Sequence, residues 1–203
     1  MATTVHLVRH AAHELVDRVL VARSIGAALS SAGLRQAQAL VSHFIREPIA
    51  SVQSSPQLRA RQTGQPIADS HGLPLEIAPE IDEIAMGAWS GRSFDELKDD
   101  PHWVRWNSQR DATRPPHGES IREVQNRMLA HLARVCAAYR GERILVVSHA
   151  EPIRAAILHY LGLSPDDFLR VRIDPASVTT ISFRERNIDI ALNRSPLEGL
   201  VAA

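Results

Sequence analysis

The sequence has little of what disulfide-bonded, membrane-spanning or secreted proteins depend on. Its 203 residues include one cysteine, Cys136, which excludes an internal disulfide and a zinc site made of several cysteines, and which fits a reducing compartment. No stretch approaches the roughly 18 apolar residues of a membrane span. The N-terminus lacks the basic region and long apolar stretch of a secretory signal. We therefore expect a cytoplasmic protein with no membrane partner.

The chain also has no net charge, because its 23 basic residues balance its 23 acidic ones. Nucleic acids and acidic lipids bind proteins with a basic excess, so no nucleic-acid partner is expected either. Lys98 is the only lysine, and the other basic residues are arginines. Arginine binds phosphate and carboxylate with two parallel hydrogen bonds, but gene base composition is the simplest explanation for most of this excess. Only the positions of individual arginines can therefore indicate function.

Short β-rich runs alternate with segments of helical periodicity along the chain. Strands are predicted at residues 5–8, 51–54, 75–77 and 144–147, and helices at 30–44, 58–70, 121–139 and 152–161. A helical turn at 95–98 precedes a segment, 99–117, that we expect to be irregular. Two runs, 178–183 and 188–192, flank Arg186-Asn187 and predict a terminal hairpin. This alternation predicts one α/β domain over residues 1–203, a three-layer α/β/α sandwich with a mainly parallel central sheet.

Histidines and arginines follow the predicted strands. Arg9 and His10 come directly after the first strand, and Arg59 opens the helix that follows the second. His149 follows the buried strand 144–147 and precedes another helix. Because the carboxyl ends of parallel strands meet at one edge of a sheet, we expect these side chains to lie close together. Imidazoles, guanidiniums and a helix N-terminus at one edge make a site for an anion.

This combination suits phosphoryl transfer. A neutral imidazole is a nucleophile near pH 7 and can carry a phosphoryl group covalently, while guanidiniums neutralise charge on the phosphate oxygens. The leaving alkoxide needs a proton, and Asp82 and Glu83 offer carboxyl groups in a glycine-containing segment. No histidine pair has the i, i+4 spacing of a helical metal site, and His10 and His13 lack a carboxylate partner at a recognised spacing. We therefore expect no metal.

Five motifs, in order along nearly the whole chain, resemble those of the histidine phosphatase superfamily, also called phosphoglycerate mutase-like. They are Leu7-Val8-Arg9-His10 (LxRH), residues 54–63 (SSPxxRAxQT), 83–91 (ExxxGxWxG), 118–120 (GES) and 146–149, which ends in a second histidine. Residues 33–37 are also similar to the family's GxxQA helix start. The resemblance implies an α/β/α sandwich and an activity that needs no metal and no cofactor.

The resemblance also implies a role for each matching residue. His10 would accept the phosphoryl group. Arg9, Arg59 and His149 would bind the phosphate oxygens, with His149 also donating a proton to the transition state. Glu83 would be the general acid for the leaving group and then the base for the water that hydrolyses phosphohistidine.

The chain departs from the family pattern beside both histidines. The family usually has glycine, threonine and asparagine where this sequence has Ala11, His13 and Val16, and often glycine where Ala150 follows the second histidine. An alanine is tolerated where φ is negative and strained where φ is positive. His13 would add a third imidazole to the pocket. Together with Ala150 and Arg23, which stands at the family's glycine–arginine position, it is expected to contact the substrate.

These observations predict a metal-independent phosphomonoester hydrolase of the histidine acid phosphatase type. It would act through phosphohistidine on a small phosphorylated metabolite and release inorganic phosphate. One alternative is a phosphoglycerate mutase-type phosphotransferase, although such mutases are typically longer and shield the intermediate from water. The other is a non-catalytic phospho-ligand-binding member of the fold that retains Arg9, Arg59 and His149. A homodimer is expected only because relatives often form one.

Overall fold

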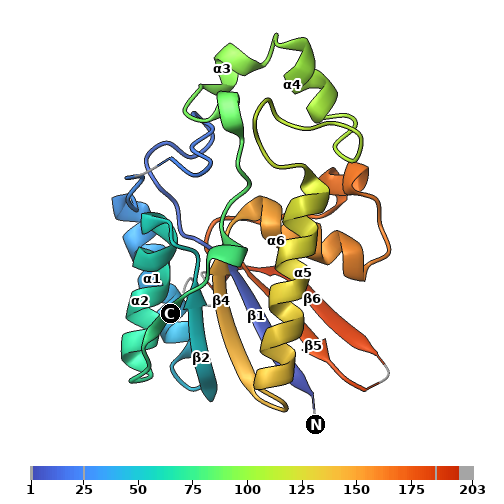
Figure 1. Cartoon of the computed structure of the whole chain (residues 1–203). Coiled ribbons are helices and arrows are strands. Elements are labelled where there is room, and N and C mark those ends of the chain that lie inside the picture. Colours follow the sequence, from blue (N-terminus) through green and yellow to red (C-terminus); the bar gives the residue numbers. More distant parts are fainter. Residues whose placement is uncertain (1, 25, 186, 197–203) are drawn as a thin grey trace.

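The computed structural model describes residues 2–24, 26–185 and 187–196, and its strands form one six-stranded sheet (Figure 1). The strands are β1 (Thr3–Arg9), β2 (Ile49–Ser54), β3 (Leu75–Ile77), β4 (Arg143–Ser148), β5 (Val178–Phe183) and β6 (Ile188–Arg194). They lie in the order β3-β2-β4-β1-β5-β6. The first four of these pair in parallel, β5 runs antiparallel to β1, and β6 runs antiparallel to β5. The predicted mainly parallel sheet is confirmed.

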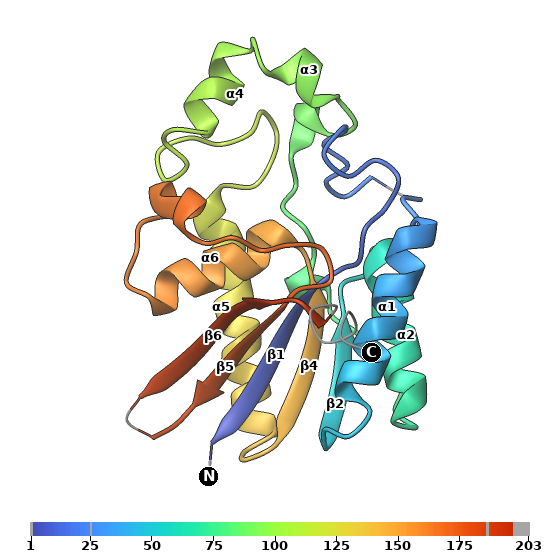
Figure 2. The ribbon, with the colours of Figure 1, turned by 180° about the vertical axis from the view of Figure 1, so that it is seen from behind.

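Helices cover both faces of this sheet, which confirms the three-layer α/β/α arrangement (Figures 1 and 2). The α-helices are α1 (Ser31–Phe44), α2 (Leu58–Ser70), α3 (Phe94–Leu97), α4 (Pro101–Trp106), α5 (Ile121–Ala138) and α6 (Ala150–Tyr160). Three short 3-10 helices are η1 (Pro79–Ile81), η2 (Gly87–Trp89) and η3 (Pro165–Arg170). None of the helices in the described part of the chain combines the length and apolar character needed to cross a bilayer.

The central strands β1 and β4 lie between two hydrophobic cores, and their alternating side chains contribute to both. Val5 and Leu7 of β1 pack on the α5–α6 side, whereas Val8, with Leu145 and Val147 of β4, packs on the α1–α2 side. All five side chains are fully buried. A strand covered by helices on both faces is apolar at every position, which is why the run 144–147 could be recognised in the sequence.

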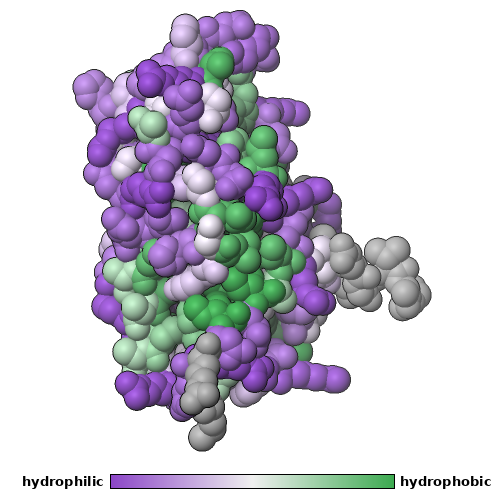
Figure 3. Space-filling model, turned by 90° about the vertical axis from the view of Figure 1, so that its right-hand side faces the viewer, coloured by the Kyte–Doolittle hydropathy of each residue, from purple (hydrophilic) through white to green (hydrophobic). Residues whose placement is uncertain are grey.

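The remaining edge of the sheet is less completely covered. Figure 3 shows an apolar area on the side of the molecule formed by the β5–β6 hairpin and α6. Ile188 and Leu192 of the edge strand β6 are 41% and 40% exposed there. The antiparallel pairing of β5 and β6 confirms the predicted terminal hairpin. Arg186, which was expected at its turn, lies outside the described residues.

Residues 87–117, here called the cap, lie over the carboxyl ends of the strands and carry α3 and α4 (Figure 1). The expectation that residues 99–117 are irregular was wrong for Pro101–Trp106, which form α4. The Asp100 side chain accepts a hydrogen bond from the backbone N–H of His102, and Pro101 occupies the first helical position. Both are ordinary helix-start signals. Trp106, the last residue of α4, and Trp89 are buried in a third hydrophobic cluster.

Gly33 fixes how closely α1 approaches the loop after β1. The Ser30 side chain caps α1 by accepting a hydrogen bond from the Gly33 N–H. A Cβ atom at Gly33 would lie 1.9 Å from the carbonyl oxygen of Ala12, which belongs to the loop that follows His10. Glycine is therefore required for this helix to pack directly behind that loop.

We expect Gly33→Ala to lower the free energy of unfolding by about 2 kcal/mol, because the added methyl group forces the helix or the loop to move. Urea unfolding followed by circular dichroism measures this. Leu34→Ala is the matched control: Leu34 is 55% exposed on the same turn of the helix, and its truncation should change stability by less than about 0.5 kcal/mol. Equal stability of the Gly33→Ala variant and the wild type would contradict the steric requirement.

Candidate active site

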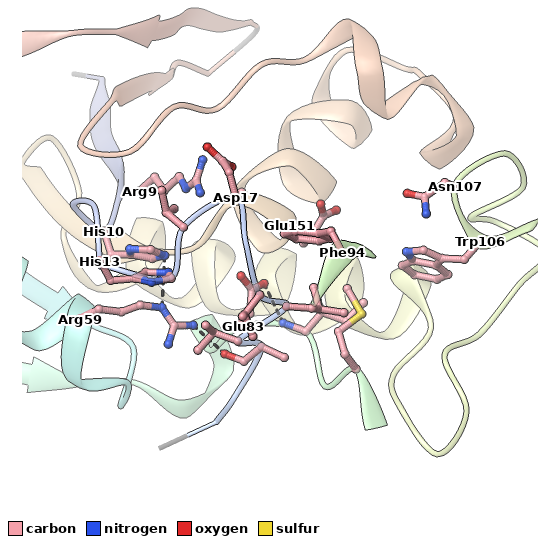
Figure 4. Close-up of a pocket in the computed structure, with 18 of the residues that line it drawn as sticks. Arg9, His10, His13, Asp17, Arg59, Glu83, Phe94, Trp106, Asn107 and Glu151 are labelled. Carbon is pink, nitrogen blue, oxygen red and sulfur yellow. Dashed lines mark hydrogen bonds between the residues drawn. The ribbon is translucent and has the colours of Figure 1, made fainter. Parts of the chain in front are cut away.

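A cavity of about 240 Å³ opens at the carboxyl ends of the strands beneath the cap. Five of the predicted site residues line one end of it: Arg9, His10, His13, Arg59 and Glu83. Figure 4 shows His10, His13 and Arg59 together at this end, with Trp106 and Asn107 at the other. His149 lies just behind, and its ring centroid is 5.0 Å from that of His10. The strand-end residues predicted to meet are thus brought together.

His10 is held in one orientation with one nitrogen free to react. Its Nδ1–H donates to the carbonyl oxygen of Ala11 at 2.8 Å. The lone pair therefore sits on Nε2, which accepts a hydrogen bond from Nε of Arg59 at 3.2 Å. Burial, followed by the positive charges of Arg59 and Arg9, holds the pKa of His10 well below its ordinary value. The imidazole is therefore neutral at physiological pH, as a nucleophile must be.

Arg59, in the first turn of α2, links several parts of the site. Besides His10, its guanidinium contacts the carbonyl oxygen of Ala22 at 2.6 Å and Nδ1 of His149 at 3.2 Å through Nη2. The side chain is almost completely buried, and this burial lowers its pKa. Ala22 has a φ of +48°, a left-handed conformation that is unfavourable for alanine. The strained loop residue thus supplies the carbonyl that fixes the guanidinium.

A chain of hydrogen bonds orients His149. Its Nε2 lies 2.7 Å from Oγ of Ser55, and the Ser55 hydroxyl donates to Oδ1 of Asp82 at 2.9 Å. Because the serine proton is directed at Asp82, Nε2 of His149 is the donor, and Nδ1 faces Arg59 and Glu83. Ser55 lies within the motif at residues 54–63 and Asp82 directly precedes the motif at residues 83–91, but the sequence assigned neither of them this positioning contact.

Glu83 is buried beside the two histidines. Its Oε1 accepts the Ile84 N–H at 2.9 Å, and its Oε2 lies 3.8 Å from Nδ1 of His149. Burial raises the pKa of Glu83 to about 7, although the Arg59 charge acts in the opposite direction. Glu83 can therefore hold or release a proton near neutrality, as acid–base chemistry requires.

The backbone of Glu83 is fixed by two arginines. Arg23 Nε and Arg127 Nη2 donate to its carbonyl oxygen at 2.6 and 3.0 Å, and both guanidiniums also bind Glu119. Arg23 was predicted to contact substrate, but it is absent from the described residues that line the cavity. Arg127 was not singled out in the sequence, because its partners lie far away along the chain.

The other predicted residues are placed around the phosphate end. Arg9 Nη1 donates to the carbonyl oxygen of Ile173 at 2.8 Å, and burial lowers the pKa of this arginine. The His13 ring lies 5.6 Å from that of His10, and burial, aided by Arg59 and Arg9, lowers the pKa of His13 to about 4. Ala150 lines the cavity at the start of α6. Neither Ala11 nor Ala150 has a positive φ, so the two replaced glycines leave no backbone strain.

A family model described as histidine phosphatase superfamily (branch 1) matches residues 5–194. The chain belongs to the histidine phosphatase superfamily. It is 32% identical over 190 residues to phosphoserine phosphatase 1 of Hydrogenobacter thermophilus, with 92% of this chain and 90% of that protein covered. It is 30% identical over 161 residues to a probable phosphoglycerate mutase of Yersinia pestis, with 77% and 74% covered.

The solved structure of YhfR from Bacillus stearothermophilus shares the fold of this superfamily member. It aligns with a TM-score of 0.89 at 23% identity, and the alignment covers 97% of this chain and 100% of that chain. Other relatives are longer: the chain spans about half the length of the curated mycobacterial proteins it matches, among them a bifunctional protein of Mycobacterium tuberculosis. No group of three or more histidine, cysteine, aspartate or glutamate side chains that could hold a metal occurs within the described ranges.

A buried ion pair between Arg110 and Glu151 also lines the cavity. Arg110 of the cap binds Glu151 in the first turn of α6, and its guanidinium stacks 3.6 Å from the ring centroid of Phe168. Glu151 also accepts from Nη1 of Arg154 at 2.5 Å. Burial acts to raise the pKa of Glu151, but these two arginines outweigh it and lower the pKa to about 2. The pair ties the cap to α6. Its two residues are 41 positions apart, so no local sequence pattern predicts their contact.

We expect Glu151→Gln to lower the free energy of unfolding by about 3 kcal/mol at pH 7, because it leaves the Arg110 guanidinium buried without a counter-charge. Urea unfolding measures the difference. The Glu151 pKa is depressed, so its contribution is present above about pH 4.5 and is lost as the pH falls toward 2, where the two proteins should converge. Asp95→Asn, which breaks an exposed pair with Lys98, is the control, and its effect should be small. A glutamine variant as stable as the wild type at pH 7 would disprove this role.

Proposed function

We propose that the chain is a metal-independent phosphomonoester hydrolase that acts through phosphohistidine formed on His10. The observation that carries this proposal is the neutral His10 imidazole, whose free Nε2 points at a cluster of buried cationic groups. Nucleophile and phosphate ligands are thus within reach of one bound phosphoryl group. The similarity to a relative named phosphoserine phosphatase 1 supports hydrolysis of a phosphorylated small molecule.

The first step is attack by Nε2 of His10 on phosphorus, which breaks the bond to the ester oxygen. A bound phosphate replaces the hydrogen bond that Arg59 now donates to His10. Arg9 and Arg59 then neutralise the charge that spreads over the equatorial oxygens in the transition state. A bound dianion also raises the pKa of His149, which favours its protonated form and a hydrogen bond from Nδ1 to a phosphate oxygen.

Glu83 supplies the proton that the departing alkoxide needs. With a pKa of about 7 it is largely protonated below neutrality, so the proton passes from its carboxyl group to the leaving oxygen as the P–O bond breaks. The resulting carboxylate then takes a proton from water, and the hydroxide attacks phosphohistidine. This second step frees His10, releases inorganic phosphate and returns the proton to Glu83.

His10→Ala should lower the rate of 4-nitrophenyl phosphate hydrolysis by at least about a thousandfold, because it removes the group proposed to accept the phosphoryl group. Hydrolysis by the wild type should need no added metal and should be unaffected by EDTA. Acid-labile phosphate should label the wild type in rapid-quench experiments and not the variant. An unchanged rate in His10→Ala would refute the nucleophile, and absence of both turnover and labelling in the wild type would favour the non-catalytic binding alternative.

The rate on an alkyl phosphate should fall as the pH rises above about 7, because Glu83 then loses the proton that it donates. Glu83→Gln should lower this rate by about 10²- to 10⁴-fold and remove the Glu83-dependent decline. The loss should be much smaller on 4-nitrophenyl phosphate, whose leaving group barely needs protonation. Measurement of kcat/KM against pH for both substrates separates these effects. Full alkyl phosphatase activity in Glu83→Gln would rule out the general-acid role.

A further inference from the structure

The part of the cavity beyond the phosphate end, here called the distal chamber, is largely apolar. Its walls come from the loop after β1, from the segment before the cap and from the cap itself. The apolar side chains that line it include Val16, Val19, Leu20, Met86, Phe94 and Trp103. In Figure 4 Phe94 lies between the His10 and Arg59 side chains at one end and Trp106 at the other. A leaving group seated here would exchange water for hydrocarbon and aromatic surface.

The charged groups of the distal chamber do not offer a partner for an anionic leaving group. Arg110 is the only cationic side chain among the described residues at that end, and Glu151 already neutralises it. The remaining arginines of the cavity, Arg9 and Arg59, lie at the phosphate end. Asp17 also lines the cavity and repels negative charge. A carboxylate on the leaving group would therefore lose its hydration without gaining an ion pair, which is costly.

The size of the cavity limits the leaving group. An apolar cavity of about 150 Å³ accommodates one benzene molecule, and the volume here is about 240 Å³, phosphate end included. After a phosphoryl group is placed beside His10, room remains for about one ring or a chain of about six carbons. A longer chain would have to leave through the mouth of the cavity.

We infer that the substrate of this site is a phosphomonoester of an uncharged, apolar alcohol with about six carbons or one ring. The inference rests on the proposed phosphatase function and adds the class of leaving group. Val16 is central to it, since this apolar side chain lines the cavity at a position where an asparagine would offer hydrogen bonds instead. The phosphate end performs the chemistry, and the distal chamber selects the alcohol.

A series of n-alkyl phosphates from ethyl to hexyl tests the inference, because their alcohols have nearly the same acidity and differ only in apolar surface. We expect kcat/KM to rise about three- to fourfold for each added methylene until the chamber is filled. Isobutyl phosphate and phosphoserine form a second comparison, because both alcohols branch at the second carbon but only serine carries charged ammonium and carboxylate groups there. Isobutyl phosphate should be hydrolysed with a kcat/KM at least tenfold higher.

The variant Val16→Asn should flatten the chain-length series and narrow the preference for isobutyl phosphate over phosphoserine. Val104→Asn is the matched control, because Val104 lies on α4 of the cap, is 54% exposed and does not line the cavity; it should leave the series unchanged. Phe94→Asn, on the cap side of the chamber, repeats the test if Val16→Asn fails to fold.

The outcomes separate this inference from the proposed function. A flat chain-length series, or phosphoserine hydrolysed as well as isobutyl phosphate, would overturn the inference while leaving the phosphatase intact. No hydrolysis of any phosphomonoester, together with no acid-labile labelling of His10, would instead overturn the function on which the inference rests. A rising series that Val16→Asn flattens and Val104→Asn preserves supports both.

Discussion

The guanidinium of Arg59 is the group on which the rest of the site depends. It contacts both imidazoles, at 3.2 Å in each case, and is itself anchored by the Ala22 carbonyl oxygen. Neither Arg59 nor Arg9 has a carboxylate within 4 Å among the described residues. Arg9 and Arg59 therefore hold two largely buried positive charges without a direct carboxylate partner. Under the proposed function a phosphate dianion would balance these charges, so the same groups would provide both binding energy and catalytic geometry.

The same electrostatics set the protonation states that catalysis needs. Burial and the two guanidiniums lower the pKa of His10, which keeps its imidazole neutral, while burial raises the pKa of Glu83 to about 7. Groups whose environments push their pKa values apart can act as nucleophile and acid in one pocket. In the proposed reaction the negative charge of a phosphate dianion would disfavour the Glu83 carboxylate, so the proton would stay on Glu83 until the leaving oxygen takes it.

Much of the fold and the catalytic end could be predicted because local patterns encode them. The bounds of α2 and β3 agree with the prediction, since Gly72 and Pro74 separate the two elements. The α4 helix was missed because its arginine and tryptophan side chains show no clear helical stripe, although Asp100 and Pro101 mark its start. The sequence predicted a substrate contact for Arg23 but could not predict its hydrogen bond to Glu119, because Glu119 lies 96 residues away along the chain. Contacts of this kind depend on packing between distant segments.

The two ends of the cavity differ in how the chain builds them. The phosphate end consists of side chains that directly follow strands, so the sheet places them wherever the strands form. The distal chamber is assembled from the loop after β1, the segment before the cap and the cap itself, and the buried pair of Arg110 and Glu151 ties the cap to α6. Because these walls do not belong to the strands that place His10, substitutions there can change the inferred selectivity without moving His10. Under the proposed function the reaction chemistry follows from short motifs, whereas the inferred selectivity depends on how the cap packs.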